Sequence, residues 1–335
     1  MHEITTIGVD LAKQTFQLHG VDRHGKAVLR KTVSRAKLLE SFVNLPPCLV
    51  GLEACGGAHH WAREIGKLGH EVRIIAPQFV APYRKSGKND ANDAEAICEA
   101  VGRPNMRFVA IKTPEQQAAL TVHRVREAIK TERTALINQI RGLLQEFGIV
   151  LPQGAATFCK RLLEVLQTTE LPGETTSVLA ELRGHLLRLK ERLAEYDRKI
   201  ARLAKDETAQ RLAEIPGVGP VIATAVVATV GDATLFRNGR ELAAWVGLVP
   251  RQSSSGGHCR LGRITKHGDS YLRTLFVQGA MTVIRHLGEK TDPRSQWIRS
   301  LIARCGIQKA AVALAAKMVR TSWVLMARGE HYRMA

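Results

Sequence analysis

Short β-type runs alternate with helical patterns over the first hundred residues, and this alternation restricts the fold more than any other feature of the chain. Three strand patterns joined by tight turns come first, and strand–helix–strand units follow. Such an order predicts a mixed sheet flanked by helices. The predicted strands cover residues 5–9, 15–21, 27–33, 49–52 and 72–75, and the predicted helices cover residues 35–43 and 59–68.

Two of these strands end on an acidic residue. Asp10 closes the run TTIGVD, and Glu53 closes the run CLVGLE. Ligand and metal sites in open sheets gather beyond the carboxyl ends of strands, and the order of elements matches the ribonuclease H type of fold. We therefore expect Asp10 and Glu53 to lie side by side on neighbouring central strands.

Two further acids stand at the start of a predicted helix, in the run KNDANDAEAI. Asp90 and Asp93 are three residues apart and share one helix face, with Asn89 or Asp90 available as the N-cap. Four carboxylates brought close would repel one another, and divalent cations remove this repulsion. We predict that Asp10, Glu53, Asp90 and Asp93 bind Mg²⁺, as a pair of ions suited to phosphodiester chemistry. Taken singly, each acid is equally compatible with a cap or a surface charge.

The charge of the chain predicts a polyanionic partner. The 335 residues carry a net charge of +18, and residues 237–335 hold 17 Lys and Arg against 5 Asp and Glu. This balance favours nucleic acid, although charge alone does not separate nucleic acid from an anionic membrane. The six cysteines lack a CxxC or Cys/His ligand spacing, no signal peptide begins the chain, and we expect a cytoplasmic protein without membrane segments.

The middle of the chain predicts long helices. A helical pattern covers residues 114–147, and an apolar residue then recurs at alternating spacings of three and four. A second copy of the chain or another helix of the same chain can cover such a stripe, and we favour a dimerising coiled coil. The stripe consists of Leu179, Leu182, Leu186, Leu189, Leu193, Tyr196, Ile200 and Leu203.

A glycine turn follows within residues 212–232. The sequence IPGVGP places Gly217 and Gly219 before an apolar helix, which is the pattern of a helix-hairpin-helix. Glycines at that position let backbone N–H groups approach a phosphate at a helix N-terminus. A plain turn between two helices is the alternative.

Residues 246–276 are rich in glycine, serine and arginine and predict a phosphate-binding loop. Its basic residues would stabilise charge on a phosphate, and one of its serines is a candidate nucleophile. The alternative is a loop whose serines only donate hydrogen bonds, because His258 alone is weak evidence for a general base. The basic residues of this loop are Arg251, Arg260, Arg263, Lys266 and Arg273.

These motifs together resemble a known family. GVDLAK, GLEACGG, NDANDAEAI, IPGVGP and GLVPRQSSSGG occur in the order found in the DEDD transposases of bacterial insertion sequences, which are relatives of the Piv-type DNA invertases. The resemblance covers essentially the whole chain. It implies a DNA recombinase that is guided by a structured non-coding RNA, called bridge or seeker RNA, which pairs with donor and target DNA.

The resemblance also implies a domain plan. Residues 1–150 would form a RuvC-like domain whose four acids bind Mg²⁺, residues 151–206 a coiled coil that joins subunits, and residues 207–335 a basic, mainly helical transposase domain. The family's catalytic serine precedes a glycine in the basic loop, which corresponds here to Ser255 before Gly256. Ser253 and Ser254 remain alternatives to this assignment.

The implied mechanism is serine recombination in a dimer or tetramer. Ser255 would attack a DNA phosphodiester and form a phosphoserine link, while Mg²⁺ polarises the phosphate. Two alternatives stay open. In a metal-only nuclease of the Holliday-junction resolvase type, water attacks and Ser255 only binds phosphate; in a non-catalytic nucleic-acid-binding protein, the acids are structural.

Overall fold

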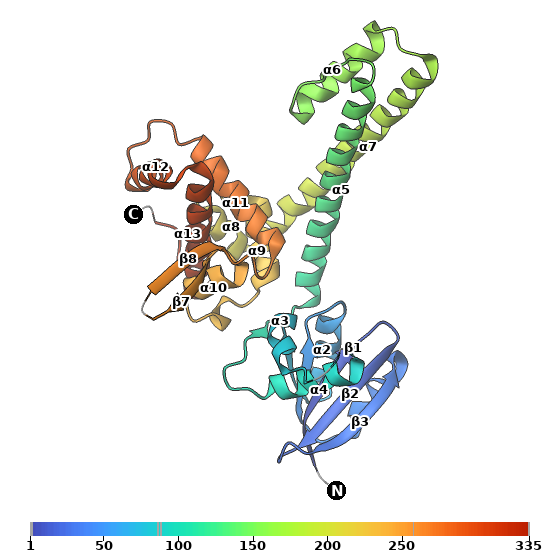
Figure 1. Ribbon diagram of the computed structural model, residues 1–335, viewed down its shortest axis with the longest axis vertical. Coiled ribbons are helices and arrows are strands. Elements are labelled where there is room, and N and C mark those ends of the chain that lie inside the picture. Colours follow the sequence, from blue (N-terminus) through green and yellow to red (C-terminus); the bar gives the residue numbers. More distant parts are fainter. Residues whose placement is uncertain (1–2, 86, 88, 257, 334–335) are drawn as a thin grey trace. The chain divides into compact units, whose positions relative to one another are not determined.

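The chain folds into two compact units, residues 1–113 (unit 1) and residues 114–335 (unit 2) (Figure 1). The computed structural model describes residues 3–85, 87, 89–256 and 258–333. The long helix α5 (Pro114–Gln145) packs against helices of unit 2, and the domain boundary expected at residue 150 stays a prediction.

Unit 1 is built on a six-stranded mixed sheet in the order β3-β2-β1-β4-β5-β6. Strands β1, β4 and β5 are parallel, whereas β2, β3 and β6 pair in antiparallel fashion with their neighbours. All five predicted strands are confirmed, and the architecture is consistent with the ribonuclease H type. The strands are β1 (Ile4–Leu11), β2 (Thr15–Asp22), β3 (Ala27–Ser34), β4 (Leu49–Glu53), β5 (Glu71–Ile75) and the two-residue β6 (Phe108–Val109).

Helices cover the sheet of unit 1. The predicted helix over residues 35–43 divides into a 3-10 turn and one short α-helix, and the predicted helix over residues 59–68 is confirmed as α2. Trp61 and Ile65 of α2 pack with the strand residues Ile7, Val9 and Leu52 in one buried core. The helical elements are η1 (Arg35–Lys37), α1 (Glu40–Val43), α2 (Ala58–Gly66), α3 (Pro77–Val80), η2 (Ala81–Tyr83) and α4 (Asp90–Val101).

Glycines on the two central strands let α4 lie almost in backbone contact with the sheet. Side chains alternate along a strand, so Gly8 and Gly51 occupy the strand face opposite to the large apolar neighbours that pack with α2. A Cβ on Gly8 would lie 2.2 Å from the carbonyl oxygen of Ala94, and a Cβ on Gly51 would lie 2.8 Å from Cβ of Val101. Both distances are too short for a side chain, so glycine determines how close α4 comes.

Unit 2 begins with a helical hairpin formed by α5, α6 (Ala155–Thr168) and α7 (Gly173–Leu203). Leu179, Leu186 and Leu189 of the heptad stripe are buried against Ile137 and Ile140 of α5. The alternative of pairing within one chain therefore accounts for this stripe. A dimer formed through this segment stays a prediction.

The rest of unit 2 is a helical core that carries one β-hairpin. The apolar helix α13 lies at its centre and packs against α10, α11 and α12. Within the described residues, α13 alone is long and apolar enough to cross a membrane, and it is a buried core helix here. The elements are α8 (Glu207–Ala213), α9 (Pro220–Val230), η3 (Ala233–Leu235), α10 (Gly239–Val246), β7 (Pro250–Ser255), β8 (His258–Ile264), α11 (Ser270–Arg285), α12 (Pro293–Cys305) and α13 (Ile307–Arg328).

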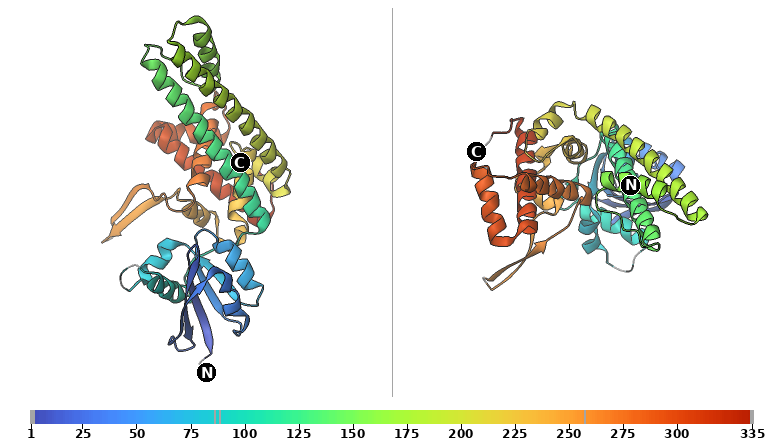
Figure 2. Two further views of the ribbon diagram at one scale, coloured as in Figure 1. Left: turned by 90° about the vertical axis from the view of Figure 1, so that its right-hand side faces the viewer. Right: turned by 90° about the horizontal axis from the view of Figure 1, so that it is seen from above.

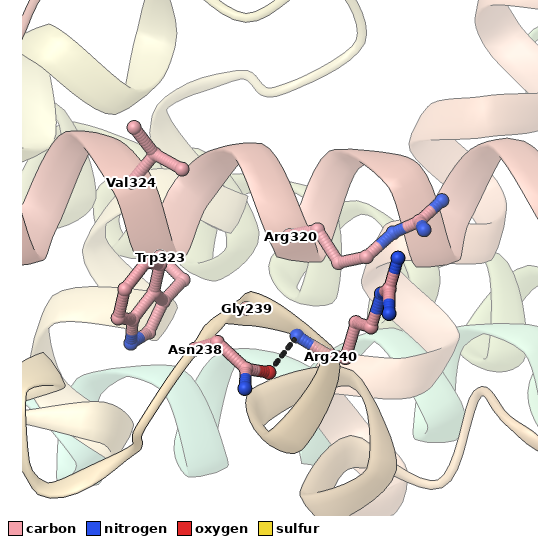
Figure 3. A pocket seen from close by; sticks show the side chains of 6 residues that line it. All are labelled: Asn238, Gly239, Arg240, Arg320, Trp323 and Val324. Atoms are coloured by element: carbon pink, nitrogen blue, oxygen red, sulfur yellow. Dashed lines mark hydrogen bonds between the residues drawn. The ribbon is translucent and has the colours of Figure 1, made fainter.

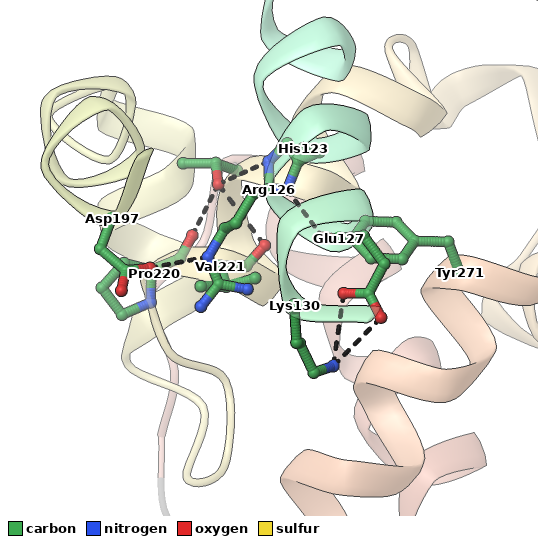
Figure 4. Close-up of polar contacts among 9 residues, drawn as sticks. His123, Arg126, Glu127, Lys130, Asp197, Pro220, Val221 and Tyr271 are labelled. Carbon is green, nitrogen blue, oxygen red and sulfur yellow. Dashed lines mark hydrogen bonds and ion pairs between the residues drawn. The ribbon is translucent and has the colours of Figure 1, made fainter. Parts of the chain in front are cut away.

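A buried polar relay joins α5 to this core (Figure 4). The Thr224 hydroxyl donates to the carbonyl of Pro220 at 2.7 Å, so its oxygen accepts from Nε2–H of His123 at 3.0 Å. Nδ1 of His123 is then left to accept the hydroxyl of Tyr271 at 3.0 Å. Burial, and next the charge of Arg126, lowers the pKa of His123 to about 4. The relay therefore holds a neutral imidazole between α5, α9 and α11.

We predict that Gly8→Ala destabilises unit 1. The added methyl meets backbone atoms of α4, which cannot move as a side chain does, so overpacking should cost about 2 to 3 kcal/mol of unfolding free energy. This exceeds the roughly 0.5–1 kcal/mol gained by removing a glycine from a strand. Urea unfolding measures the effect. Gly102→Ala is the control, because Gly102 follows α4 in a helical conformation with open space around its Cβ position; equal stability of the two variants would contradict the close seating.

Candidate functional site

The sheet of unit 1 places two of the predicted acids at one edge. Val9 of β1 pairs with Leu52 of β4 in parallel register, so the next residues, Asp10 and Glu53, lie at the carboxyl ends of adjacent strands. Asp10 is half-buried, and Glu53 is the last residue of β4. This is the arrangement expected from the strand pattern.

The start of α4 brings the other two acids to the same edge. Asn89 is the N-cap, and its side chain accepts a hydrogen bond from the N–H of Asn92 at 2.8 Å. Asp90 is the first helical residue and is exposed, whereas Asp93, one turn later, is buried. Acids in the first turn are favoured by the positive end of the helix dipole.

The four carboxylates interact with one another electrostatically. The pKa of Asp10 is raised from 3.8 to about 6, first by burial and then by the charges of Asp90, Asp93 and Glu53, in that order. Three elements separated in the sequence therefore converge on one carboxyl group. An all-oxygen, multiply charged set of this kind suits a hard divalent cation.

The side chains are not arranged as a finished coordination shell. Across the part of the chain that the structure describes, no three His, Cys, Asp or Glu side chains meet closely enough to bind an ion. One carboxylate oxygen of Asp93 is held by Nε of Arg84. The donor chemistry fits a divalent cation, and the side chains would have to turn to converge on one.

Sequence reasoning missed two contributors to this site. Arg84 lies in an irregular segment nine residues before its partner, where no periodic pattern identifies an ion pair. Gly8 and Gly51 seat the helix that carries Asp90 and Asp93. A glycine inside each of two apolar strand patterns was the available signal, because interior strand glycines often mark close backbone approach.

Ser255 lies at the tip of the β7–β8 hairpin in unit 2. Figure 2 shows that this hairpin extends away from the helices of its unit. Ser255 is the last residue of β7 and precedes Gly256, whose φ of 55° lies in the left-handed region that favours glycine. Both residues are exposed.

The hairpin separates the three serines by face. Successive side chains on a strand point to opposite faces, so Ser253 and Ser255 share one face and Ser254 lies on the other. The Ser254 hydroxyl accepts a hydrogen bond from the side-chain amide of Gln252 at 2.9 Å. Ser253 is paired directly with Arg260 across the ladder. The hairpin face that carries Ser253 and Ser255 therefore also carries the guanidinium of Arg260.

The basic residues of this segment fall into two groups. Arg251, Arg260, Arg263 and Lys266 are exposed on the hairpin or just after it, as a phosphate-binding surface requires. Arg273 instead turns inward and donates from Nη1 to the carbonyl oxygens of Val246 at 2.9 Å and His267 at 3.0 Å. Its guanidinium therefore holds the end of α10 to the base of the hairpin.

The two glycines of the IPGVGP turn also differ. Gly217, with φ of 92°, packs against α11, where an added Cβ would lie 2.8 Å from the carbonyl oxygen of Gly279. Gly219 is exposed, has open space around it and precedes α9, whose first turn has no side-chain cap. Gly219 is therefore the position of this turn that is open to a phosphate.

We predict that Asp10→Asn stabilises unit 1 at neutral pH without metal. Because the pKa of folded Asp10 is raised to about 6, protonation of this residue stabilises the fold below pH 4, and that stabilisation is lost as the pH rises through 6. The pH dependence of the stability of unit 1 is measured by hydrogen exchange of the β1 and α4 amides. The experiment is run in EDTA from pH 4 to 8, and the rates are corrected for intrinsic exchange. Mg²⁺ should protect the wild type and not Asp10→Asn. The same response from the exposed-carboxylate variant Glu40→Gln would contradict a specific site.

We predict that Arg273→Ala loosens the hairpin, whereas Arg263→Ala weakens nucleic-acid binding. Loss of two charged hydrogen bonds should cost about 2 to 3 kcal/mol and speed amide exchange in β7 and β8. Loss of an exposed arginine should leave exchange unchanged and reduce the salt slope of binding by about 1. Both variants, Arg273→Ala and Arg263→Ala, are measured by hydrogen exchange and by nucleic-acid binding at several salt concentrations. Unchanged exchange in Arg273→Ala would contradict the anchoring role.

Comparisons with known proteins match both parts of the chain. Residues 7–149, which include the four acids, match the DEDD transposase model of the IS110 group. Residues 209–297, which include Ser255, match the model described as "Transposase IS116/IS110/IS902 family". A DEDD transposase domain implies the use of a divalent metal and a DNA substrate.

Relatives extend the match over nearly the whole length. The chain is 51% identical over 334 residues to the "Probable family 20 transposase" of Pseudomonas aeruginosa, which covers 98% of this chain and 99% of that protein. It is 44% identical over 336 residues to the "Transposase for insertion sequence element IS1111A" of Coxiella burnetii, covering 99% of this chain and 92% of that protein. The chain therefore belongs to the IS116/IS110/IS902 family of transposases, enzymes that process DNA to move insertion sequences.

Proposed function

We propose that this transposase is an RNA-guided recombinase that cuts and rejoins DNA through Ser255 and a Mg²⁺ site formed by Asp10, Glu53, Asp90 and Asp93. The observation that carries the proposal is the influence of the other three carboxylates on Asp10, whose pKa they raise, together with burial, to about 6. A structural role for these acids would not require four like charges to face one another, since such a set lowers stability without a cation.

The proposed metal site is set by the fold of unit 1. Mg²⁺ bound there would polarise a DNA phosphate and stabilise the leaving 3′-oxygen. Asp10 and Glu53 would provide ligands from rigid strands, and Asp90 and Asp93 from the first turn of α4. Arg84 pairs with one carboxylate oxygen of Asp93 and would help to position that side chain beside the ion.

The proposed nucleophile is the hydroxyl of Ser255. Its oxygen forms a bond to phosphorus as the bond to the 3′-oxygen breaks, and the hydroxyl proton passes by way of solvent to the 3′-oxygen, which leaves as a 3′-hydroxyl. This gives a phosphoserine link and keeps the bond energy for religation without a nucleotide cofactor. Arg260 and Arg263 of β8, together with Arg251 of β7, would bind the phosphates on either side. The left-handed conformation of Gly256 turns the chain directly after the nucleophile.

The proposed site is composite. The four acids belong to unit 1 and Ser255 to unit 2, so the two units, from one chain or from two, must come together on DNA. We propose a dimer, or a tetramer when donor and target duplexes are both held, because each duplex requires its own nucleophile. The acting complex would work in the bacterial cytoplasm, where its DNA is located.

A structured RNA is proposed as the source of sequence choice. Exposed arginines and the open turn at Gly219 contact phosphates, and phosphate contacts position nucleic acid without reading its sequence. Base pairing with donor and target DNA would supply the missing specificity, as it does in other guided systems. The net charge of +18 suits a protein that holds RNA and DNA together.

We expect a covalent protein–DNA adduct from the wild type and none from Ser255→Ala. The purified protein is incubated with its element-derived RNA, Mg²⁺ and end-labelled junction DNA, and the adduct is recognised by its sensitivity to protease. Ser254→Ala is the matched control and should retain the adduct, because Ser254 lies on the opposite face and bonds to Gln252. Asp10→Ala should lose the adduct as well, since the metal site is then incomplete.

Other outcomes identify the competing mechanisms. If DNA is cleaved without a covalent adduct, and Ser255→Ala still cleaves it, the protein is a hydrolytic, metal-only nuclease and the serine mechanism is wrong. Binding without Mg²⁺-dependent cleavage in the wild type, unchanged by Asp10→Ala, would make the protein a non-catalytic nucleic-acid binder. Loss of the adduct in Ser253→Ala alone would move the nucleophile to the other serine on the same face.

A further inference from the structure

A pocket in unit 2 lies outside the metal set and the hairpin. It has a volume of about 310 Å³ and opens between the start of α10 and the second half of α13 (Figure 3). Two cations, one aromatic ring and an apolar side chain surround it. The lining residues are Asn238, Gly239, Arg240, Arg320, Trp323 and Val324.

The walls of the pocket are held rigidly. A Cβ on Gly239 would lie 2.8 Å from the carbonyl oxygen of Arg320, so the first turn of α10 rests on the backbone of α13. The Asn238 side chain caps α10 by accepting from the N–H groups of Arg240 at 3.0 Å and Glu241 at 3.1 Å. The pocket is therefore formed before any ligand arrives, which lowers the entropic cost of binding.

The indole of Trp323 is fixed in orientation. Its Nε1–H donates to the carbonyl oxygens of Ala233 at 3.0 Å and Phe236 at 3.1 Å. The donor is thus satisfied inside the protein, and the half-buried ring is left to offer its apolar surface to the pocket. Val324, the next residue of α13, also lines the pocket. A flat ring held in this way is a platform for another flat ring.

Two positive charges lie beside this platform without acidic partners. Figure 3 shows the guanidinium groups of Arg240 and Arg320 extending to the same side of the pocket. Both side chains are exposed, and neither forms an ion pair with a carboxylate of the described residues; Arg320 only donates to the carbonyl of Ala316 at 3.3 Å. Like charges held close together repel, and a bound phosphate would remove the repulsion.

We infer that this pocket binds one unpaired nucleotide, with its base or sugar against Trp323 and Val324 and its phosphate between Arg240 and Arg320. A base in a duplex is stacked on both faces and cannot lie on an indole, so the ligand is single-stranded RNA or a displaced DNA strand. The inference extends the proposed function by assigning a separate contact for the strand that is not paired. It uses neither Ser255 nor the four acids.

The test measures binding of the full-length protein in EDTA, so that no cleavage chemistry takes part. Fluorescein-labelled 12-nucleotide RNA, DNA of the same sequence and a blunt 12-base-pair DNA duplex are titrated at constant salt. The variant Arg240→Gln/Arg320→Gln should bind both single strands about tenfold more weakly and the duplex nearly as before. A preference for RNA or for DNA identifies the source of the nucleotide.

The matched control removes the same charge elsewhere. Arg285 and Arg304 are exposed arginines of α11 and α12 in the same unit, and Arg285→Gln/Arg304→Gln should lower all affinities slightly and equally. Trp323→Leu keeps apolar volume but removes the stacking ring, and it should lose the preference for single strands over duplex. Circular dichroism and thermal unfolding establish that each variant is folded.

Two results would overturn the inference. Single-strand affinities of the double variant equal to those of its control would show that the pocket binds no nucleic acid. Equal loss for single strands and duplex would show a general phosphate surface and no nucleotide pocket. Both results are independent of the covalent adduct, so failure of this inference and failure of the serine mechanism can be told apart.

Discussion

Everything proposed for unit 1 depends on how closely one helix approaches the sheet. Gly8 and Gly51 bring α4 almost into backbone contact with β1 and β4, and this places Asp90 and Asp93 within electrostatic reach of Asp10. Four acids at the end of a sheet would otherwise be separate surface charges. The seating converts a sequence pattern into a cluster of acids whose repulsion protonation of Asp10 or a bound cation relieves, and Arg84 already pairs with Asp93.

The strands and the convergence of the four acids were predictable from sequence because their signals are local, and metal binding by these acids stays a prediction. Short apolar runs define β1 and β4, and an acid at each strand end requires no knowledge of the rest of the chain. The domain boundary was harder to predict. The DEDD model runs to residue 149, whereas contacts divide the chain at residue 113, because α5 is continuous in sequence with unit 1 and packs with unit 2. Periodicity detects a helix but not its packing partner.

The basic segment shows the same limit at the level of single residues. Arg273 and Arg263 are equivalent in composition, yet one anchors backbone carbonyls and the other is exposed on β8. Gly217 and Gly219 are likewise the same residue type in one turn, but only the Cβ position of Gly219 has open space around it. Whether a residue turns inward or outward depends on neighbours distant in the sequence, so composition identified a basic region but could not separate its inward-turning members from its exposed ones. The pocket at Trp323 lacked any sequence motif for the same reason.

The pairing of α5 with α7 has a consequence for assembly. The heptad stripe does not itself distinguish a helix of the same chain from one of another chain. The two helices are joined through residues 146–172, so each meets the other at an effective concentration on the order of millimolar. A helix from a second copy of the chain must reach a higher local concentration than this to displace the partner helix of the same chain. Two chains bound along one nucleic acid are the setting in which such an exchange of helices becomes competitive.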